Sequence, residues 1–201
     1  MKIAVISDIH ENFHNLILAL DHIQSSGAEA IICLGDLINA GIAKVLSIQS
    51  IPVYMIWGNN DGEKTDIVRT AFRPNSNLQV SLNVYDFLEL GGRKIFISHY
   101  DDLASPMARS GIYDAVFYGH THQKSIERIG DTLVVNPGEL AAQKTGIASF
   151  VIYDTENNDV EMIELDNIIS LKSPVVGDYF KKHREALDFR SSASFKIDGH
   201  E

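Results

Sequence analysis

The first half of the chain alternates short apolar runs with segments whose apolar residues have helical spacing. Residues 2–7 (KIAVIS) are rich in β-branched side chains and predict a strand, and the spacing of Phe13, Leu16 and Leu20 predicts a helix after it. The alternation continues through apolar runs at residues 28–36 and 51–58 and helical segments at residues 42–46 and 64–72. Such alternation favours a parallel sheet covered by helices, and therefore an α/β fold.

After about residue 77 the sequence changes to pairs of strand-like runs separated by turn residues. Gly91-Gly92, Gly130-Asp131 and residues 155–158 (TENN) each lie between two such runs. Turn residues that tolerate positive φ predict antiparallel hairpins. Residues 103–111 predict a small helix and residues 115–120 a buried strand, so the second half is expected to be rich in β-structure.

Length, charge and hydropathy restrict the class of protein. A chain of 201 residues fits one compact domain, expected over residues 1–170, with a C-terminal helix and tail over 171–201 that pack on the domain or fray from it. The net charge of −10 argues against extensive nucleic-acid binding through a broad basic face. No apolar run approaches the ~20 residues that span a bilayer, so we expect no membrane association and a cytoplasmic protein.

Potential metal ligands follow almost every predicted strand. They are Asp8 and His10, Asp36, Asn59, His99, and His120 and His122. The carboxyl ends of parallel strands lie along one edge of a sheet, where open α/β folds form their clefts. If the D-x-H and H-x-H triplets are extended, both side chains of each triplet point to the same side and can meet a metal centre.

The chemistry of these seven side chains indicates more than one ion. A structural zinc site is usually closed by four ligands, and thiolates are absent from the set. Imidazole, carboxylate and carboxamide groups suit borderline to hard divalent ions such as Mn, Fe, Ni or Zn. One bridging carboxylate would allow the set to hold two ions.

The ordered motifs D-I-H, G-D, G-N-N-D, H and G-H-T-H, from Met1 to about Glu164, resemble the calcineurin-like metallophosphoesterases, especially their small single-domain phosphodiesterase branch. The resemblance implies a four-layer αββα sandwich, in which helices flank two mixed sheets. It also implies a binuclear centre with two divalent ions. The implied ligands are Asp8, His10 and His122 for one ion, Asn59, His99 and His120 for the other, and Asp36 as the bridge.

The implied activity is the hydrolysis of phosphodiester and also monoester bonds in a small substrate, with a hydroxide that bridges the two ions as nucleophile. Full members of the family carry a histidine, the expected proton donor to the leaving group, where this chain has Asn60. Since a carboxamide cannot act as a general acid near neutral pH, the loss predicts turnover slower by ~10² to 10⁴. Either Asp61 or water would replace the missing acid.

Two further residues are candidates for substrate binding. Asn12 is a plausible N-cap of the first helix, with substrate contact as the second interpretation. Tyr100 follows His99 where the family usually has glycine, and its ring could form a wall of the substrate site. The sequence leaves open whether the protein is a monomer or a homo-oligomer.

Two other functions compete with the hydrolase. The retromer scaffold subunit shares the implied fold and also lacks the acidic histidine, so a non-enzymatic interaction module is the alternative. A nuclease of the kind found in double-strand-break repair would need a further domain and a basic surface. The complete ligand set, including Asp36 and both histidines of G-H-T-H, favours the enzyme.

Overall fold

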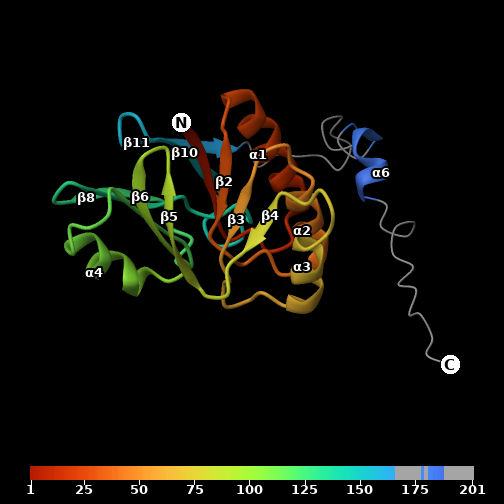
Figure 1. Cartoon of the computed structure of the whole chain (residues 1–201), viewed down its shortest axis with the longest axis horizontal. Coiled ribbons are helices and arrows are strands. Elements are labelled where there is room, and N and C mark those ends of the chain that lie inside the picture. The colour runs from red at the N-terminus through yellow and green to blue at the C-terminus, as the bar shows by residue number, and fades with distance from the viewer. Residues whose placement is uncertain (166–177, 179–180, 188–201) are drawn as a thin grey trace.

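A computed structural model describes residues 1–165, 178 and 181–187 (Figure 1). The helices are α1 (Phe13–Ser26), α2 (Ala40–Ser47), α3 (Lys64–Ala71), α4 (Ala104–Arg109) and α6 (Arg184–Leu187), with a 3₁₀ turn at Asp101–Leu103. The strands are β1 (Lys2–Ile6), β2 (Ala30–Cys33), β3 (Val53–Met55), β4 (Leu78–Val80), β5 (Tyr85–Leu90), β6 (Arg93–Ser98), β7 (Ala115–Tyr118), β8 (Ser125–Ile129), β9 (Thr132–Asn136), β10 (Ala148–Asp154) and β11 (Asp159–Leu165).

The strands form two mixed sheets. The first has the order β11-β10-β1-β2-β3-β4, in which β1 to β4 are parallel and β10 and β11 are antiparallel to their neighbours. The second has the order β5-β6-β7-β9-β8, with β6, β7 and β9 parallel and a hairpin partner at each edge. The predicted parallel first half and the three predicted hairpins are therefore confirmed.

The fold has four layers of helices and sheets, and an apolar cluster lies between each pair of adjacent layers. The central cluster lies between the two sheets and includes Ile3, Val5, Ile32, Ile97, Phe117, Val135 and Tyr153, all at most 1% exposed. A second cluster packs the first sheet against α1, α2 and α3, and a smaller one packs the second sheet against α4. Figure 1 shows α1–α3 and α4 on opposite sides of the sheets. The four-layer αββα sandwich implied by the resemblance is confirmed.

The ends of α1 agree with their sequence signals. The Asn12 side chain accepts a hydrogen bond from the Asn15 backbone N–H at 3.1 Å, as an N-cap does. Gly27 closes the helix with φ of 72°, a left-handed conformation that glycine adopts at little cost. One strand was not predicted: β4 is only three residues long, and its pairing with β3 defines it better than its own sequence does.

The predicted C-terminal helix and tail over residues 171–201 are described only in part. Within the described residues, α6 covers Arg184–Leu187, and Leu187 packs against the apolar cluster beneath α1–α3. The proposed boundary at residue 170 and the tail after residue 187 lie outside the described residues.

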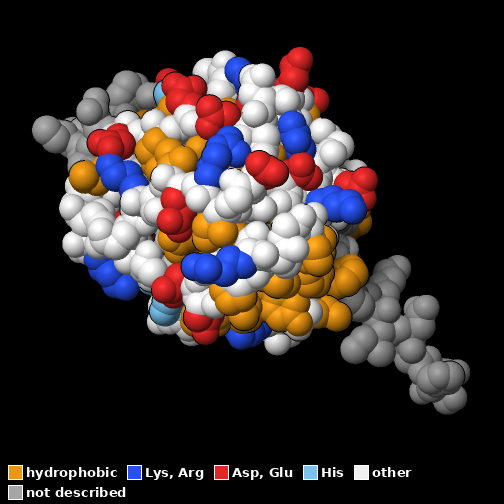
Figure 2. Space-filling view, turned by 90° about the vertical axis from the view of Figure 1, so that its left-hand side faces the viewer, with side chains coloured by type: hydrophobic (Ala, Val, Ile, Leu, Met, Phe, Trp, Pro, Cys, Tyr) orange, Lys and Arg blue, Asp and Glu red, His pale blue; other side chains and the backbone are white. Residues whose placement is uncertain are grey.

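In the part of the chain that the structure describes, no helix has the length and hydropathy to cross a membrane. Figure 2 views the side that carries β8 and α4 and shows Lys and Arg side chains interspersed with Asp and Glu. Exposed hydrophobic residues of the second sheet and the loop after α4 include Phe87, Ile112 and Ile126. Charges of both signs are therefore mixed on this face.

Candidate metal centre

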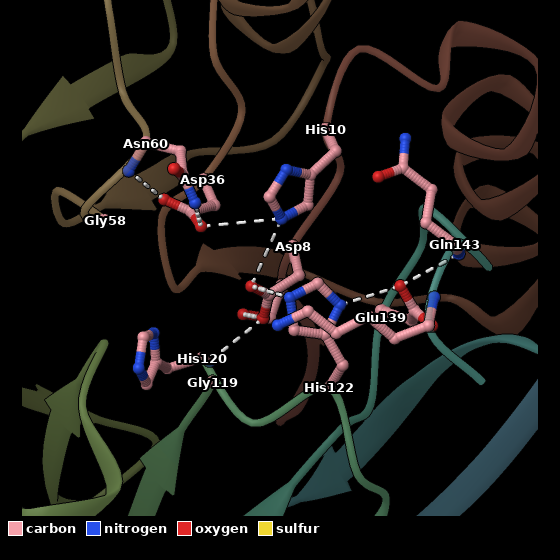
Figure 3. Close-up of polar contacts among 12 residues, drawn as sticks. Asp8, His10, Asp36, Gly58, Asn60, Gly119, His120, His122, Glu139 and Gln143 are labelled. Atoms are coloured by element: carbon pink, nitrogen blue, oxygen red, sulfur yellow. Dashed lines mark hydrogen bonds and ion pairs between the residues drawn. The ribbon is translucent and has the colours of Figure 1, made fainter.

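The ligand candidates meet at one rim of the sandwich, and both sheets contribute to it. Asp8 and His10 follow β1, Asp36 follows β2, Asn59 follows β3, His99 follows β6, and His120 and His122 follow β7. Figure 3 shows several of these side chains pointing toward one another. The structure thus brings together all seven residues that the sequence singled out.

Asp8, His10 and His122 form one group, which we name the Asp8 half-site. Asp8 Oδ1 lies 3.3 Å from His122 Nε2 and 3.7 Å from His10 Nε2. Asp8 and His122 are buried, and the two imidazole rings stack with centroids 5.1 Å apart. Three donor atoms therefore converge on a small volume, as one metal ion requires.

Asp36, Asn59, His99 and His120 form the second group, the Asp36 half-site. Asn59 Oδ1 lies 2.9 Å from His99 Nε2 and 2.8 Å from His120 Nδ1. His99 Nδ1 lies 2.7 Å from the Leu34 carbonyl. The Leu34 carbonyl only accepts, so a proton on His99 Nδ1 has a partner there. The Asn59 Oδ1 atom is also an acceptor, so in this tautomer the lone pairs of His99 Nε2 and Asn59 Oδ1 face each other, as two ligands of one ion do.

Asp36 reaches both groups. Its Oδ2 atom lies 3.4 Å from His10 Nε2 of the Asp8 half-site and 3.7 Å from His99 Nε2 of its own half-site. One carboxylate therefore stands between two clusters of donor atoms, which is the arrangement that a bridging ligand needs.

Two buried polar atoms lack the partners that burial normally demands. Among the described residues, neither Asp8 Oδ1 nor His10 Nε2 has a hydrogen-bond partner. An unpaired buried polar atom costs free energy, so most native structures avoid it. Both atoms face the same cluster of oxygen and nitrogen donors, and a divalent ion would satisfy them. The residues present therefore fit such an ion.

Local electrostatics also favour positive charge at the Asp8 half-site. Burial by itself would raise the pKa of Asp8, but its contacts with His10 and Ser7 outweigh burial and hold the pKa below its ordinary value. The contact with Asp8 raises the pKa of His10 more than burial lowers it. The buried carboxylate thus remains ionised and attracts a cation.

The backbone at the ligands is not extended, contrary to the interpretation of the D-x-H and H-x-H triplets. Asp8, His10, His120 and His122 have φ of 51°, 42°, 65° and 64°, in the left-handed region. Asp36 has φ of 54°. Non-glycine residues rarely adopt this region, and such strain concentrates at functional sites. Tight turns, rather than the alternation of a strand, direct both side chains of each triplet into the site.

The glycines before the ligands permit close approach of neighbouring loops. A Cβ on Gly58 would lie 2.1 Å from Asp36 Oδ1, and one on Gly119 would lie 2.1 Å from Ser7 Oγ. Of the three glycines that precede Asp36, Asn59 and His120, Gly35 itself has positive φ, at 95°. The positive-φ turns therefore fall mainly on the candidate ligands themselves. The glycines provide space for the neighbouring loop.

Asp61 lies behind Asp36 rather than among the ligands. Its two oxygens accept hydrogen bonds from four backbone N–H groups: Asp36 at 3.1 Å, Leu37 at 2.8 Å, Ile38 at 2.9 Å and Gly58 at 2.7 Å. The side chain is buried. These contacts make Asp61 an anchor of the loop after β2, which is a different role from the predicted replacement for the missing acid.

Asn60 contacts the candidate bridging residue directly. Its backbone N–H donates to Asp36 Oδ1 and its Nδ2 donates to Asp36 Oδ2, both at 2.7 Å. The residue is exposed at the mouth of the site. Asn60 is therefore positioned to donate hydrogen bonds next to the candidate metal ligands.

The two substrate candidates differ in their surroundings. Asn12 caps α1 and also donates from Nδ2 to the Ala141 carbonyl at 3.0 Å, so both polar groups of its side chain have partners in the fold. Tyr100 lies beside the Asp36 half-site, with its ring centroid 5.0 Å from that of His120 and 5.2 Å from that of His99. Tyr100 is thus placed where a wall of the site would be.

Glu139 is a residue at the site that the sequence reasoning missed. Its Oε2 atom lies 2.7 Å from His122 Nδ1, and the side chain is fully buried. Burial by itself would raise the pKa of Glu139, but the bonds from His122 and Thr145 lower it. The residue follows the Asn136-Pro137-Gly138 turn, and that turn was the one signal in the sequence that could have led to it.

Comparison with known proteins places the chain in a family. A sequence model of the calcineurin-like phosphoesterase superfamily domain matches residues 1–158. Phosphodiesterase MJ0936 of Methanocaldococcus jannaschii is 31% identical over 168 residues, which cover 83% of this chain and 100% of the relative. Phosphodiesterase YfcE of Escherichia coli (strain K12) is 26% identical over 181 residues, which cover 85% and 96%.

A solved structure of a novel archaeal phosphodiesterase superposes with a TM-score of 0.76 at 31% identity, and the match covers 82% of this chain and 100% of that one. The family match covers most of the described residues and includes every ligand candidate. The chain therefore belongs to the calcineurin-like phosphoesterase superfamily.

Proposed function

We propose that this chain is a two-metal phosphodiesterase that acts on small phosphodiesters. The family match and the 31% identical relative support a hydrolase of phosphoesters, and the relative is named a phosphodiesterase. The observation that carries the proposal is the position of Asp36, whose carboxylate lies between two sets of donor atoms. Nitrogen and oxygen donors without thiolates favour Mn, Fe, Ni or Zn as the ions.

When bound, two adjacent divalent ions would lower the pKa of a coordinated water and neutralise charge on the phosphoryl oxygens. The chain's own residues define how that chemistry is used. Asp8 would hold one ion with His10 and His122, and Asp36 would be shared. Asn59, His99 and His120 would hold the other ion.

Asn60 sets the expected speed of the reaction. Its carboxamide can donate a hydrogen bond to an oxygen of the substrate but cannot release a proton to a leaving group near neutral pH. The absence of a positioned general acid typically costs ~10² to 10⁴ in rate, so turnover should be slow. Substrates whose leaving group needs little protonation, such as aryl phosphodiesters, should be favoured.

The alternative is a scaffold that has kept the fold without the reaction. Such a protein has no need for a complete ligand set or for buried polar atoms without partners. Here Asp8 Oδ1 and His10 Nε2 are both buried and have no hydrogen bond within the described residues, only ion-pair contacts at 3.3 to 3.7 Å. That arrangement supports an ion at the site, and hydrolysis is what separates the enzyme from a scaffold that also holds an ion.

The test is metal-dependent hydrolysis. Protein stripped with a chelator and then supplied with Mn²⁺ or Ni²⁺ is expected to hydrolyse an aryl phosphodiester faster than the corresponding monoester. Asp36→Asn and His120→Ala should both abolish the activity, whereas Asp66→Asn, an exposed residue of α3 paired with Arg69, should retain it. If no metal ion restored hydrolysis, the result would support the scaffold instead.

A further inference from the structure

One buried carboxylate outside the ligand set contacts a ligand directly. Glu139 Oε2 accepts from His122 Nδ1 at 2.7 Å and from the Gln143 N–H at 3.0 Å (Figure 3). Its Oε1 accepts from the Lys144 N–H at 2.9 Å and from the Thr145 N–H and Oγ1 at 2.7 and 2.8 Å. Five donors therefore surround a side chain that water does not reach.

This arrangement fixes which nitrogen of His122 carries the proton. A carboxylate surrounded by donors can only accept, so the proton of the neutral imidazole lies on Nδ1. The Nε2 lone pair then points toward Asp8 Oδ1, 3.3 Å away, and into the Asp8 half-site. Only this tautomer can bind an ion through Nε2. The hydrogen bond that a ligating imidazole donates to a carboxylate also increases the basicity of the imidazole.

We propose that Glu139 is a positioning residue that sets the affinity of the Asp8 half-site by holding His122 in the Nδ1–H tautomer. The inference rests on the proposed two-metal function. The same carboxylate holds the backbone of residues 143–145, so the shape of this loop and the orientation of His122 depend on one side chain.

Glu139→Gln is the sharpest variant because it keeps the size of the side chain. Its amide NH₂ group must take the place of either Oε1 or Oε2, and in both places it faces hydrogen-bond donors. Oε1 meets three donors and Oε2 meets two, so the NH₂ group is best tolerated beside His122 Nδ1. There it forces His122 into the opposite tautomer, which places a proton on Nε2 and blocks the ligand.

The test measures binding of Mn²⁺ to the metal-free chain by equilibrium dialysis with elemental analysis, together with electron paramagnetic resonance, which separates a coupled Mn pair from an isolated ion. The wild type is expected to bind two ions. Glu139→Gln should weaken one of them by about 10- to 100-fold, the usual effect of losing a residue that orients a metal ligand. The coupled-pair signal should give way to that of an isolated ion.

A double-mutant cycle distinguishes positioning from general damage. If Glu139 acts through His122, adding Glu139→Gln to His122→Ala should change Mn²⁺ affinity by less than about 2- to 3-fold, because the residue it positions is already gone. Effects that add fully would overturn the inference. Thr145→Val is the second variant, since it removes a donor to Oε1 and leaves the His122 contact in place.

Thr145→Val should keep both ions bound with affinities close to those of the wild type. If it weakens one ion as much as Glu139→Gln does, loop disorder rather than the tautomer is responsible and the inference fails. Two ions bound normally by Glu139→Gln would refute the inference and leave the two-metal function intact. A wild-type chain that binds fewer than two ions would refute both.

Discussion

The two half-sites are each supported by one buried carboxylate, but the two carboxylates act on different parts of the chain. Asp61 accepts from four backbone N–H groups around Asp36, and among the described residues it makes no hydrogen bond to a candidate ligand side chain. Glu139 accepts from a ligand side chain, His122, as well as from its own loop. One carboxylate holds the backbone that carries a candidate ligand, and the other contacts the ring of a candidate ligand.

Both regions contain left-handed residues, and the loop after β2 adds a β-branched one. Next to Asp36, the β-branched residue Ile38 has φ of 83°, which is a clear outlier for such a side chain. Its N–H is held by Asp61 and its carbonyl accepts from the Gly62 N–H at 2.9 Å. A strained backbone needs several bonds to keep it in place. The contact of Glu139 with His122 acts on a side chain instead, because an acceptor at Nδ1 favours the tautomer with the proton on that atom.

The largest effect is expected from Asp61→Ala. The change leaves three buried N–H groups and the part-buried N–H of Ile38 without an acceptor. Each unsatisfied group costs about 1–3 kcal/mol, so a loss of roughly 4 kcal/mol in unfolding free energy is expected after some water enters. For a chain of this size that corresponds to a fall in Tm of roughly 8–16 °C. Thermal unfolding of the metal-free protein measures it.

The matched control is Asp66→Ala, which removes an exposed carboxylate from α3 and should change stability by no more than about 0.5 kcal/mol. If Asp61→Ala were as mild as this control, the loop after β2 would not depend on its buried carboxylate, and the contrast between the two half-sites would disappear.

Gly35→Ala should have the next largest effect. A Cβ there would lie 2.4 Å from the Gly58 backbone nitrogen, and the residue has φ of 95°. Overpacking of this kind together with backbone strain should cost roughly 3 kcal/mol and displace the loops that carry Asp36 and Asn59. Denaturant unfolding measures the stability, and Mn²⁺ binding reports on the Asp36 half-site.

Gly27→Ala provides the comparison, because Gly27 also has positive φ, at 72°, but a Cβ there meets nothing within 4 Å. It should cost only about 1 kcal/mol and leave metal binding unchanged. Equal losses for the two variants would show that conformational strain alone matters at Gly35 and that the close approach of the two loops does not.

Asn60→His tests the missing acid and should raise activity. A positioned imidazole can donate a proton to the leaving group and recover part of the lost rate, with an expected gain of about 10- to 100-fold. The gain should be larger for alkyl than for aryl leaving groups, because alkoxides depend more on protonation. Steady-state kinetics with a pair of substrates that differ only in the leaving group measure it. A fall in rate with both substrates would contradict this account of Asn60.

Ser7→Ala should produce the smallest effect. Ser7 Oγ donates to Asp8 Oδ2 at 2.6 Å, and the loss of this buried hydrogen bond should cost about 1 kcal/mol of unfolding free energy at neutral pH. The backbone N–H of His120 still donates to the same oxygen at 3.0 Å, which limits the loss. Ser25→Ala, an exposed change in α1, should be close to neutral.

The Ser7 effect also has a defined pH dependence. The Ser7 bond is one of the contacts that hold the pKa of Asp8 below its ordinary value against the opposing effect of burial. Its contribution to stability is therefore present above the pKa of the unfolded carboxyl and is lost as pH falls through the lowered pKa of the folded state. The difference in unfolding free energy between Ser7→Ala and the wild type should therefore be smaller in acid than at pH 7.

Local signals in the sequence were enough for most of the fold. The N-cap Asn12, the closing Gly27 and the turn at Gly91-Gly92 all lie where their residue types predict. Residues at the strand ends also identified the set that converges at the rim, because strand ends are readable from short apolar runs and the side chains after them carry distinctive chemistry. The resemblance to the family supplied the second sheet and the packing of the two sheets, which periodicity alone did not.

Only the tertiary structure decided which residues contact the candidate ligands and through which hydrogen bonds. The strand β4 exists through its pairing with β3, and the left-handed turn at Asp8 is held by contacts between loops from both sheets. The sequence around Asp61 and around Glu139 contains no pattern that distinguishes a structural carboxylate from a catalytic one. Their roles depend on which donors folding brings within about 3 Å of them, and that distance is set by the packing of segments far apart in the chain. The sequence thus determined which groups carry the chemistry, and the packing of the two sheets determined how they are held.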